Sequence, residues 1–115
     1  MTSKPLILAV TGCISGVAHT YMAAEVIETI CRELGYKASV ETQGALGIEN
    51  PHAAELIEKA DLVIFSADVT IAGRERFVGR RIIDTDIQTV LKSPEKIREA
   101  IVRILYLQNG FVMPL

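Results

Sequence analysis

The chain has 115 residues, of which 50% are hydrophobic and 23% are charged, and its formal net charge at pH 7 is −2. This length and composition are typical of one globular domain that buries a core without metals or disulfides. The small net charge excludes the overall basic field of nucleic-acid-binding proteins and a polybasic membrane-binding segment. No apolar run approaches the roughly 20 residues that cross a bilayer, and the N-terminus lacks the apolar region and cleavage site of a signal peptide. We therefore expect a cytoplasmic protein with no nucleic-acid partner and no direct membrane insertion.

The first half of the chain predicts two strands on either side of a long helix. Residues 6–10 form a continuous apolar run, which is typical of a strand buried on both faces of a parallel sheet. A helical pattern begins near Ala18 and ends at Gly35, with apolar residues three and four positions apart. Residues 36–42 alternate between apolar and polar types, which predicts a half-exposed edge strand. Residues 43–47 are then expected to be a loop.

A short helix and a third strand follow. Asn50 and Pro51 predict the start of this helix, with Asn50 as its cap and Pro51 in its first turn. Asp61 ends it, and the apolar residues 62–65 predict a buried strand. The longer connection 68–79 contains a cluster of charged residues.

The last part of the chain predicts one more strand and two helices. Residues 81–83 are expected to form a short fourth strand, and residues 84–91 a weak helix. Ser93 as a cap and Pro94 at the first helical position predict the last helix, which stops at residues 109–110.

Strands that alternate with helices predict an α/β fold: a small doubly wound, four-stranded parallel sheet of order 2-1-3-4, flanked by helices in a Rossmann-like three-layer arrangement. Residues 1–110 are expected to be one domain, and residues 111–115 a C-terminal tail. In such sheets, ligands bind outside the carboxyl ends of the strands where the strand order reverses, which here is beside the first strand. The residues directly after Val10 are therefore in the position for function.

The loop after Val10 has the features of an anion site that contains a thiol. Cys13 opens a loop that turns into a helix, so several backbone N–H groups are able to converge on one phosphate. The field of the helix N-terminus lowers the pKa of a thiol placed there and favours the nucleophilic thiolate. Gly12 allows a tight backbone path around an anion. The predicted phosphate-binding loop comprises Ile14, Ser15, Gly16, Val17, Ala18, His19 and Thr20.

The spacing of this loop is that of cysteine-dependent phosphatases, in which an Arg follows the nucleophile by six positions and is itself followed by Ser or Thr. That Arg stabilises the transferring phosphoryl group with a planar fork of donors. Here the two positions hold His19 and Thr20. A phosphocysteine can form at Cys13, with His19 stabilising the phosphate, but the missing Arg argues against rapid hydrolysis. The pattern therefore favours a phosphate carrier over a phosphatase.

Residues 13–25 resemble the active-site loop and following helix of the fructose-type enzyme IIB domains of the bacterial phosphoenolpyruvate-dependent sugar phosphotransferase system. Segments 40–44, 66–68 and 75–79 resemble the same family in the same order. The resemblance covers about residues 6–105, and the four segments together are highly specific.

The resemblance implies a phosphotransferase reaction. A phosphohistidine on an enzyme IIA protein or domain would phosphorylate Cys13, and the group would then pass to fructose or a related sugar bound by the membrane enzyme IIC. The protein would associate peripherally with enzyme IIC, and neither a cofactor nor a metal is expected. The family loop more often has Pro and Thr after the cysteine, whereas this chain has Ile14 and Ser15, which leaves the sugar open. The start of the chain and its short tail favour a standalone subunit, with a domain of a longer chain as the alternative.

Several other polar residues have either a functional or a structural interpretation. Cys31 falls on the apolar side of the first helix and is expected to be structural, and His52 is expected to face solvent. Gln43 and Gly44 either border the site or form an ordinary turn, and Asp68 either touches the loop or starts the next element. Two further sets of residues also have two interpretations. Thr11, Ser15 and Thr20 either bond the phosphate or cap the turn. The arginines of residues 74–81 either attract an acidic partner or are solvated, and they are Arg74, Arg76, Arg80 and Arg81.

Two other classes of protein compete with the carrier interpretation. A low-molecular-weight protein tyrosine phosphatase shares the topology and the cysteine loop, but it requires Arg where this chain has His19. A thioredoxin-like redox domain requires a second Cys three positions after the first, and that position is Gly16.

Overall fold

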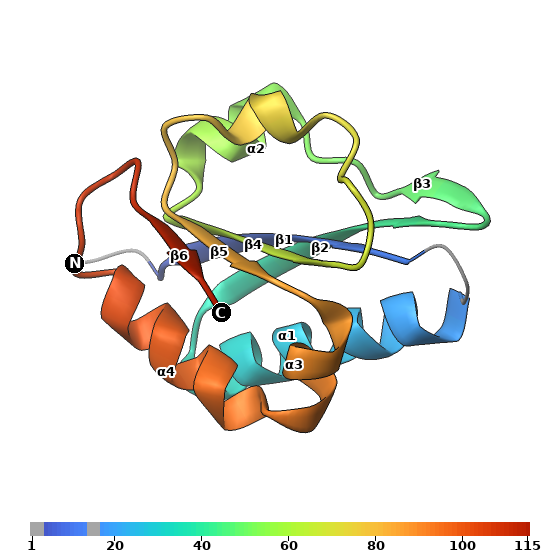
Figure 1. Ribbon diagram of the computed structural model, residues 1–115. Helices are drawn as coiled ribbons and strands as arrows, with labels where there is room; N and C mark the ends of the chain where they lie inside the picture. Colours follow the sequence, from blue (N-terminus) through green and yellow to red (C-terminus); the bar gives the residue numbers. More distant parts are fainter. Residues whose placement is uncertain (1–3, 14–16) are drawn as a thin grey trace.

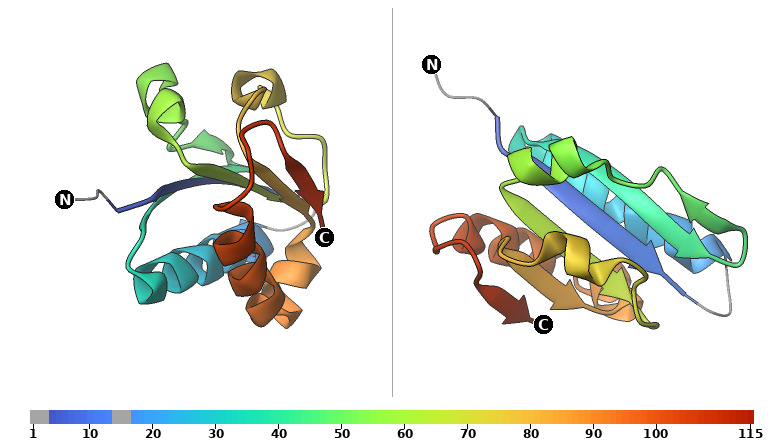
Figure 2. Two further views of the ribbon diagram at one scale, coloured as in Figure 1. Left: turned by 90° about the vertical axis from the view of Figure 1, so that its left-hand side faces the viewer. Right: turned by 90° about the horizontal axis from the view of Figure 1, so that it is seen from above.

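The computed structural model describes residues 4–13 and 17–115 as helices packed on both faces of a twisted sheet (Figures 1 and 2). In chain order, the elements are β1 (Leu6–Gly12), α1 (Val17–Leu34), β2 (Lys37–Gly44), β3 (Gly47–Glu49), α2 (Ala54–Lys59), β4 (Leu62–Ala67), the 3-10 helix η1 (Arg74–Phe77), β5 (Ile82–Thr85), α3 (Ile87–Lys92), α4 (Pro94–Ile104) and β6 (Val112–Pro114). Helices α1, α3 and α4 lie on one face of the sheet, and α2 and η1 lie on the other (Figure 1). The three-layer α/β prediction is confirmed.

The predicted strand order is correct at the centre of the sheet and incomplete at its edges. The described strands run in the order β3-β2-β1-β4-β5-β6. The four strands predicted as 2-1-3-4 are β2, β1, β4 and β5, and these neighbours are parallel. The additional strand β3 pairs antiparallel with β2, and β6 pairs parallel with β5.

The hairpin of β2 and β3 corrects two predictions. Residues 36–42 were expected to form an edge strand, but β2 lies between β1 and β3. The expected loop at residues 43–47 instead contains the end of β2, a turn at Ala45 and Leu46, and the start of β3. Gly47 has a φ of +95°, which favours glycine and lets the chain reverse within this short turn.

The C-terminal residues are not a free tail. Val112 and Met113 in β6 pair with Ile82 and Ile83 in β5, and the N–H of Leu115 donates to the carbonyl of Asp84 over 3.0 Å. The expectation of a tail at residues 111–115 is therefore wrong. A three-residue edge strand has too few residues to show an alternating pattern in the sequence.

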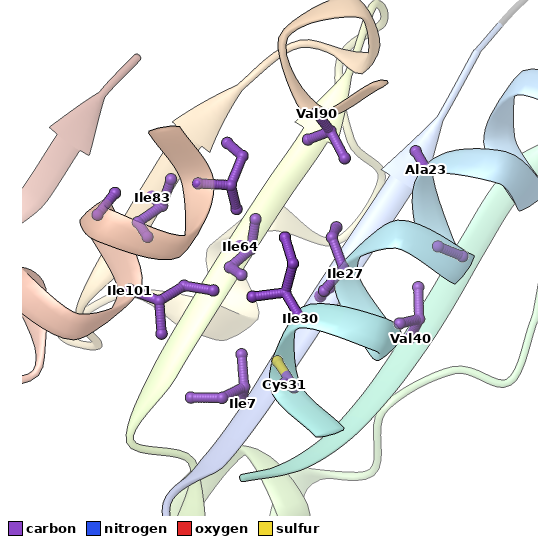
Figure 3. Packing of buried hydrophobic residues seen from close by; sticks show 14 of the residues in the cluster. Ile7, Ala23, Ile27, Ile30, Cys31, Val40, Ile64, Ile83, Val90 and Ile101 are labelled. Atoms are coloured by element: carbon purple, nitrogen blue, oxygen red, sulfur yellow. The ribbon is translucent and has the colours of Figure 1, made fainter. Parts of the chain in front are cut away.

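Helix α1 agrees with the prediction, since it begins at Val17, ends at Leu34, and is followed by Gly35 with a φ of +79°. Its apolar stripe packs on the sheet in a buried cluster with residues of β1, β4 and α4 (Figure 3). The stripe consists of Ala23, Ala24, Ile27, Ile30 and Cys31. A second buried cluster, which includes Phe65, Phe77 and Ile57, fills the opposite face beneath α2 and η1.

Two helix starts differ from the prediction. Asn50 does not cap a helix: it has a φ of +52°, its side-chain amide donates to the carbonyl of Val40 over 2.9 Å, and α2 begins only at Ala54. The predicted helix 84–91 begins at Ile87, because Asp84 and the next residue pair in β5. Helix α4 begins at Pro94 as predicted, although the Ser93 side chain accepts no capping hydrogen bond from the helix.

Candidate functional site

The candidate site lies where the carboxyl ends of three parallel strands meet. Gly12 ends β1 and stands in register with Gln43 of β2 and Ala67 of β4. Cys13 follows directly and is only 6% exposed, within the buried cluster between the sheet and α1. The end of β1 and the start of α1 lie at the same edge of the sheet (Figure 1). This is the position at which open α/β sheets bind their ligands.

The predicted phosphate-binding loop is described in part. Ile14, Ser15 and Gly16 lie outside the described residues, so the backbone cradle they were predicted to form stays a prediction. Val17 begins α1, and Ala18 and His19 are exposed on its first turn. The structure therefore places His19 at the helix start that follows Cys13.

Two buried threonine hydroxyls lie near this helix start. Thr11 on β1 is fully buried, and Thr20 on the first turn of α1 is 2% exposed. Within residues 4–13 and 17–115, neither hydroxyl oxygen has a hydrogen-bond partner. A buried hydroxyl without a partner costs free energy, so both groups have unused hydrogen-bonding capacity at the edge of the site.

The first turn of α1 also packs against the β2–β3 hairpin. A Cβ atom at Gly44 would lie 3.8 Å from the hydroxyl oxygen of Thr20. The hydroxyl of Tyr21 donates to the carboxylate of Glu49, which raises the pKa of Tyr21. The hydroxyl of Thr42 lies 3.4 Å from the same carboxylate. Gly44 thus lies next to the first turn of α1, which holds part of the predicted loop.

Glu41 contradicts the prediction of an exposed face on β2, because its side chain is fully buried. The guanidinium of Arg76 donates to both of its carboxylate oxygens over 3.0 Å, and Gln43 and the backbone N–H of His52 donate over 2.7 and 2.9 Å. Burial alone would raise the pKa of Glu41, but these hydrogen bonds and the charge of Arg76 outweigh it and lower the pKa. The buried carboxylate is therefore ionised and paired.

Gln43 forms a second set of contacts, to the connection between β4 and η1. Its side-chain oxygen accepts from the N–H of Ala72 over 2.8 Å, and its side-chain nitrogen lies 3.0 Å from the carbonyl of the same residue. Arg76 donates to the carbonyl of Gly73 over 2.7 Å. The connection is therefore held against the carboxyl end of β2.

The remaining arginines also make intramolecular contacts. Arg74 donates to the carboxylate of Asp84 over 2.8 Å and lies above the ring of Phe65. Arg80 donates to the carbonyl of Glu58, and Arg81 donates to the carbonyls of Leu107 and Asp61. The interpretation of residues 74–81 as a merely solvated charge cluster is wrong, because these side chains tie neighbouring elements together.

Asp68 and His52 both have structural contacts. The carboxylate of Asp68 accepts from the N–H of Ile87 at the start of α3 over 3.3 Å. His52 is buried, contrary to the prediction, and its Nε2 lies 2.8 Å from the carbonyl of Ala9. A carbonyl only accepts, so this ring nitrogen carries the proton. The ring of His52 also packs edge-on against Phe77.

The second cysteine agrees with its structural prediction. Cys31 is a fully buried free thiol, and burial, with a smaller contribution from the charge of Glu28, raises its pKa to about 11. A thiol of this kind is a poor nucleophile at neutral pH.

Two searches of residues 4–13 and 17–115 were negative. No group of three or more His, Cys, Asp or Glu side chains is placed to hold a metal ion. None of the helices in this part of the chain is both long and apolar enough to cross a bilayer.

Known proteins resemble this chain over most of its length. A family model described as the lactose/cellobiose-specific IIB subunit of the PTS system matches residues 8–100. The fructose-like EIIB component 3 of the PTS system from Escherichia coli K12 is 44% identical over 99 residues, which cover 86% of this chain and 88% of that protein. The crystal structure of a predicted fructose-specific IIB from Escherichia coli superposes with a TM-score of 0.92 at 40% identity, over 96% of this chain and 98% of that one.

Longer proteins contain the same domain. The fructose-specific EIIABC component from Bacillus subtilis is 38% identical over 96 residues, which cover 84% of this chain but only 15% of that protein. The resemblance inferred from residues 13–25 and the three shorter segments is thus confirmed by comparisons that extend over nearly the whole chain. The chain belongs to the family of IIB components of the sugar phosphotransferase system (PTS), among its fructose-like members.

Proposed function

We propose that this chain is the phosphocarrier of a fructose-like PTS. It takes a phosphoryl group from a phosphohistidine of enzyme IIA onto Cys13 and gives it to fructose or a related sugar held by the membrane enzyme IIC. The observation that carries the proposal is the place of Cys13, directly after β1 and directly before α1, at the carboxyl edge of the sheet. A thiol at this place lies in the field of a helix N-terminus, which favours the thiolate.

The reaction consists of two in-line transfers. In the first, the thiolate of Cys13 attacks phosphorus, the bond between phosphorus and the imidazole nitrogen breaks, and the electron pair stays on the imidazole. In the second, a sugar hydroxyl oxygen attacks, the bond between phosphorus and sulfur breaks, and the thiolate is restored. The hydroxyl proton passes to a base on enzyme IIC, since the sugar is bound there. Both steps depend mainly on positioning and charge stabilisation.

His19 and Thr20 support this assignment in different ways. His19 is exposed on the first turn of α1, where a phosphoryl group arriving on a partner protein is within reach of its ring. Thr20 is buried on the same turn and offers a hydroxyl that makes no bond within the described residues. We assign His19 to phosphate stabilisation, together with the predicted loop of residues 14–20.

The carrier role is favoured over hydrolysis for a chemical reason. A phosphatase of this topology relies on a guanidinium at the position of His19. Arg76 is paired with Glu41 of β2, and Arg74, which lies above Phe65 of β4, is paired with Asp84. A phosphocysteine formed here lacks the bidentate cation that would stabilise attack by water.

The partners follow from the same proposal. A relative with the printed name EIIABC joins the three components in one chain, so enzymes IIA and IIC are the donor and acceptor proteins we assign to this one. We place the protein in the cytoplasm, in peripheral association with enzyme IIC. We assign the phosphocarrier domain to residues 1–110 together with β6, which completes the sheet.

Phosphorylation tests this function. The chain is incubated with labelled phosphoenolpyruvate, enzyme I, HPr and fructose-type IIA proteins, as wild type, as Cys13→Ala, and as the matched control Cys31→Ala. Label is expected on the wild type and on Cys31→Ala, and none on Cys13→Ala. Label that persists on Cys13→Ala, or no label on any of the three proteins, contradicts the proposal.

A further inference from the structure

We infer that Gln43, Glu41 and Arg76 are positioning residues for Cys13, although none of them belongs to its loop. We call these three residues the β2 clamp, since two of them lie on β2 and the third is bound to them. The inference rests on the proposed function only for its kinetic test. It goes beyond that function, because it makes the geometry of the thiol depend on a buried polar network that lies on the neighbouring strand β2, outside the loop of Cys13.

The β2 clamp is closed by paired hydrogen bonds. Glu41 and Arg76 form a two-pronged ion pair, with both nitrogen–oxygen distances at 3.0 Å. Gln43 donates to the same carboxylate over 2.7 Å. The carboxylate is fully buried, whereas the Arg76 side chain is 29% exposed. A buried network with all its members bonded allows few alternative arrangements, which makes it a rigid support.

The β2 clamp holds the connection of residues 68–73 at two consecutive residues. Gln43 bonds both backbone groups of Ala72, and Arg76 bonds the carbonyls of Ala72 and Gly73. Gly73 has a φ of +73°, and a Cβ atom there would lie 2.5 Å from Nε of Arg76. The guanidinium is thus packed directly against this backbone, and only glycine leaves room for it.

The connection of residues 68–73 also packs against Gly12, the residue that precedes Cys13. Its first N–H, from Asp68, donates to the carbonyl of Gly12 over 3.0 Å. A Cβ atom at Gly12 would lie 3.0 Å from the carbonyl oxygen of Gln43 and 3.4 Å from Cγ2 of Val69. Gly12 is therefore enclosed by β2 on one side and by the connection on the other.

The β2 clamp thereby fixes the direction in which the backbone leaves β1 and enters Cys13. If the β2 clamp is broken, the connection loses its anchor at Ala72, and Gly12 gains space toward Val69. Cys13 is the next residue, so its sulfur shifts relative to the start of α1. Displacements of about 1 Å from aligned geometry are enough to cost roughly a hundred-fold in rate.

The decisive variant is Gln43→Met, which keeps the side-chain length and removes the bonds to Ala72 and Glu41. Its matched control is Asp61→Ala, which removes the carboxylate that accepts a 2.8 Å hydrogen bond from the N–H of Leu6. Leu6 begins β1 at the end opposite to Cys13. Val69→Ala is the second variant, because it removes the methyl carbon that would lie 3.4 Å from a Cβ atom at Gly12, at a partly exposed residue where folding is tolerant.

Two readouts separate positioning from stability. The first is the pH profile of iodoacetamide alkylation at Cys13, followed on the folded proteins by peptide mass spectrometry. The second is the rate of phosphoryl transfer from phospho-IIA at saturating donor. For Gln43→Met we expect transfer about ten- to a hundred-fold slower with KM nearly unchanged, and an alkylation midpoint at higher pH. Val69→Ala is expected to change the transfer rate and the alkylation midpoint in the same directions by smaller amounts. Asp61→Ala is expected to change neither readout and to lower only the midpoint of urea unfolding.

The outcomes are distinct. If Gln43→Met and Val69→Ala match Asp61→Ala in both readouts, the β2 clamp is merely structural and the inference is overturned. If Gln43→Met does not fold, Val69→Ala decides alone. If wild-type protein accepts no phosphate from any IIA, the proposed function fails, but the alkylation profile needs no phosphate donor and still tests the positioning role.

Discussion

The chemistry assigned to this chain depends on the contrast between its two thiols. Cys13 lies at a strand end beside a helix N-terminus, which favours the thiolate, whereas the pKa of Cys31 is raised to about 11 mainly by its burial under α1. His19 adds an exposed imidazole ring at the start of α1, which follows Cys13 in the chain. At the residue scale, the fold therefore places the thiol that we propose as the phosphate carrier at a strand end, and the other thiol within the core.

Replacing His19 tests its role at that helix start. For His19→Ala we expect transfer to Cys13 to slow by about tenfold, less than the roughly hundred- to thousand-fold lost with a buried oxyanion donor, because His19 is exposed. The urea midpoint is expected to stay nearly unchanged, since His19 is exposed. Single-turnover transfer from phospho-IIA measures the effect, and unchanged kinetics would reduce His19 to a surface residue.

Glu41 predicts a dependence of stability on pH. Its pKa in the folded protein is lowered from an ordinary value of 4.5, since hydrogen bonds from Arg76, Gln43 and His52 and the charge of Arg76 outweigh the opposing effect of burial. A lowered folded pKa stabilises the protein above the unfolded pKa, and this contribution is lost as pH falls through the folded value.

The variant Glu41→Gln isolates that contribution. We expect it to lower the free energy of unfolding by about 2–3 kcal/mol at pH 7, below the roughly 3–5 kcal/mol of a fully buried pair, because Arg76 is partly exposed. Urea unfolding from pH 3 to pH 7 measures the difference between the two proteins. The difference should be constant above about pH 5 and shrink below about pH 4, and a constant difference over the whole range would contradict the assignment.

At the scale of elements, the long periodic segments were predictable and the short edges were not. Helix α1 has a continuous apolar stripe and a glycine at its end, and β1 is an uninterrupted apolar run, so local pattern is sufficient for both. Strands β3 and β6 have three residues each and are mostly exposed, so neither carries a pattern. Their existence depends on the backbone groups that β2 and β5 leave unpaired.

The predicted exposure of two polar residues, Glu41 and His52, was wrong for a different reason. Glu41 fits an alternating pattern that predicts exposure, but its partner Arg76 lies 35 positions further along the chain. His52 is likewise buried by a contact with Ala9, 43 positions away. A pair of this kind leaves no local signal. The motif resemblance did mark segments 40–44 and 75–79 together, which is the one sequence signal that could have brought them into contact.

The start of η1 offers a test of this packing with a built-in control. A Cβ atom at Gly73 would force the Arg76 guanidinium away from Glu41, whereas at Gly110, with a φ of +90°, it would meet nothing within 4 Å. Gly110→Ala should therefore cost only the backbone penalty of about 1 kcal/mol, and Gly73→Ala clearly more. Equal losses in urea unfolding would show that the contact between Gly73 and Arg76 carries no energy.

At the scale of the whole molecule, the candidate site lies at the carboxyl edge of the sheet, where α1 begins on the face that also carries α3 and α4. Cys13 lies at the carboxyl ends of β1, β2 and β4 in the middle of the sheet. Strand β6 forms one edge of the sheet, and β3 forms the other (Figure 2). Doubly wound topology thus correctly predicted that Cys13 follows a central strand at the carboxyl edge of the sheet, where such folds bind ligands. The sequence alone could not predict that the C-terminal residues complete the sheet.

Removing residues 111–115 tests the contribution of β6. The truncated chain loses the backbone bonds of β6 to β5, such as the 2.9 Å bond from Ile82 to Phe111, and should be less stable by a few kcal/mol. Phosphoryl transfer to Cys13 should remain at the wild-type rate, since β6 is separated from β1 by two strands. Unchanged stability would mean that these residues behave as the tail that the sequence predicted.

The central claim is that phosphate is carried on the thiol of Cys13. The most direct measurement is peptide mass spectrometry of the chain after incubation with phosphoenolpyruvate, enzyme I, HPr and a fructose-type IIA protein, with digestion under conditions that preserve thiophosphate. One phosphoryl group is expected on the peptide that contains Cys13, and it should disappear when enzyme IIC and its sugar are added. A phosphoryl group on His19, on Cys31 or on any other residue in place of Cys13 would contradict the account.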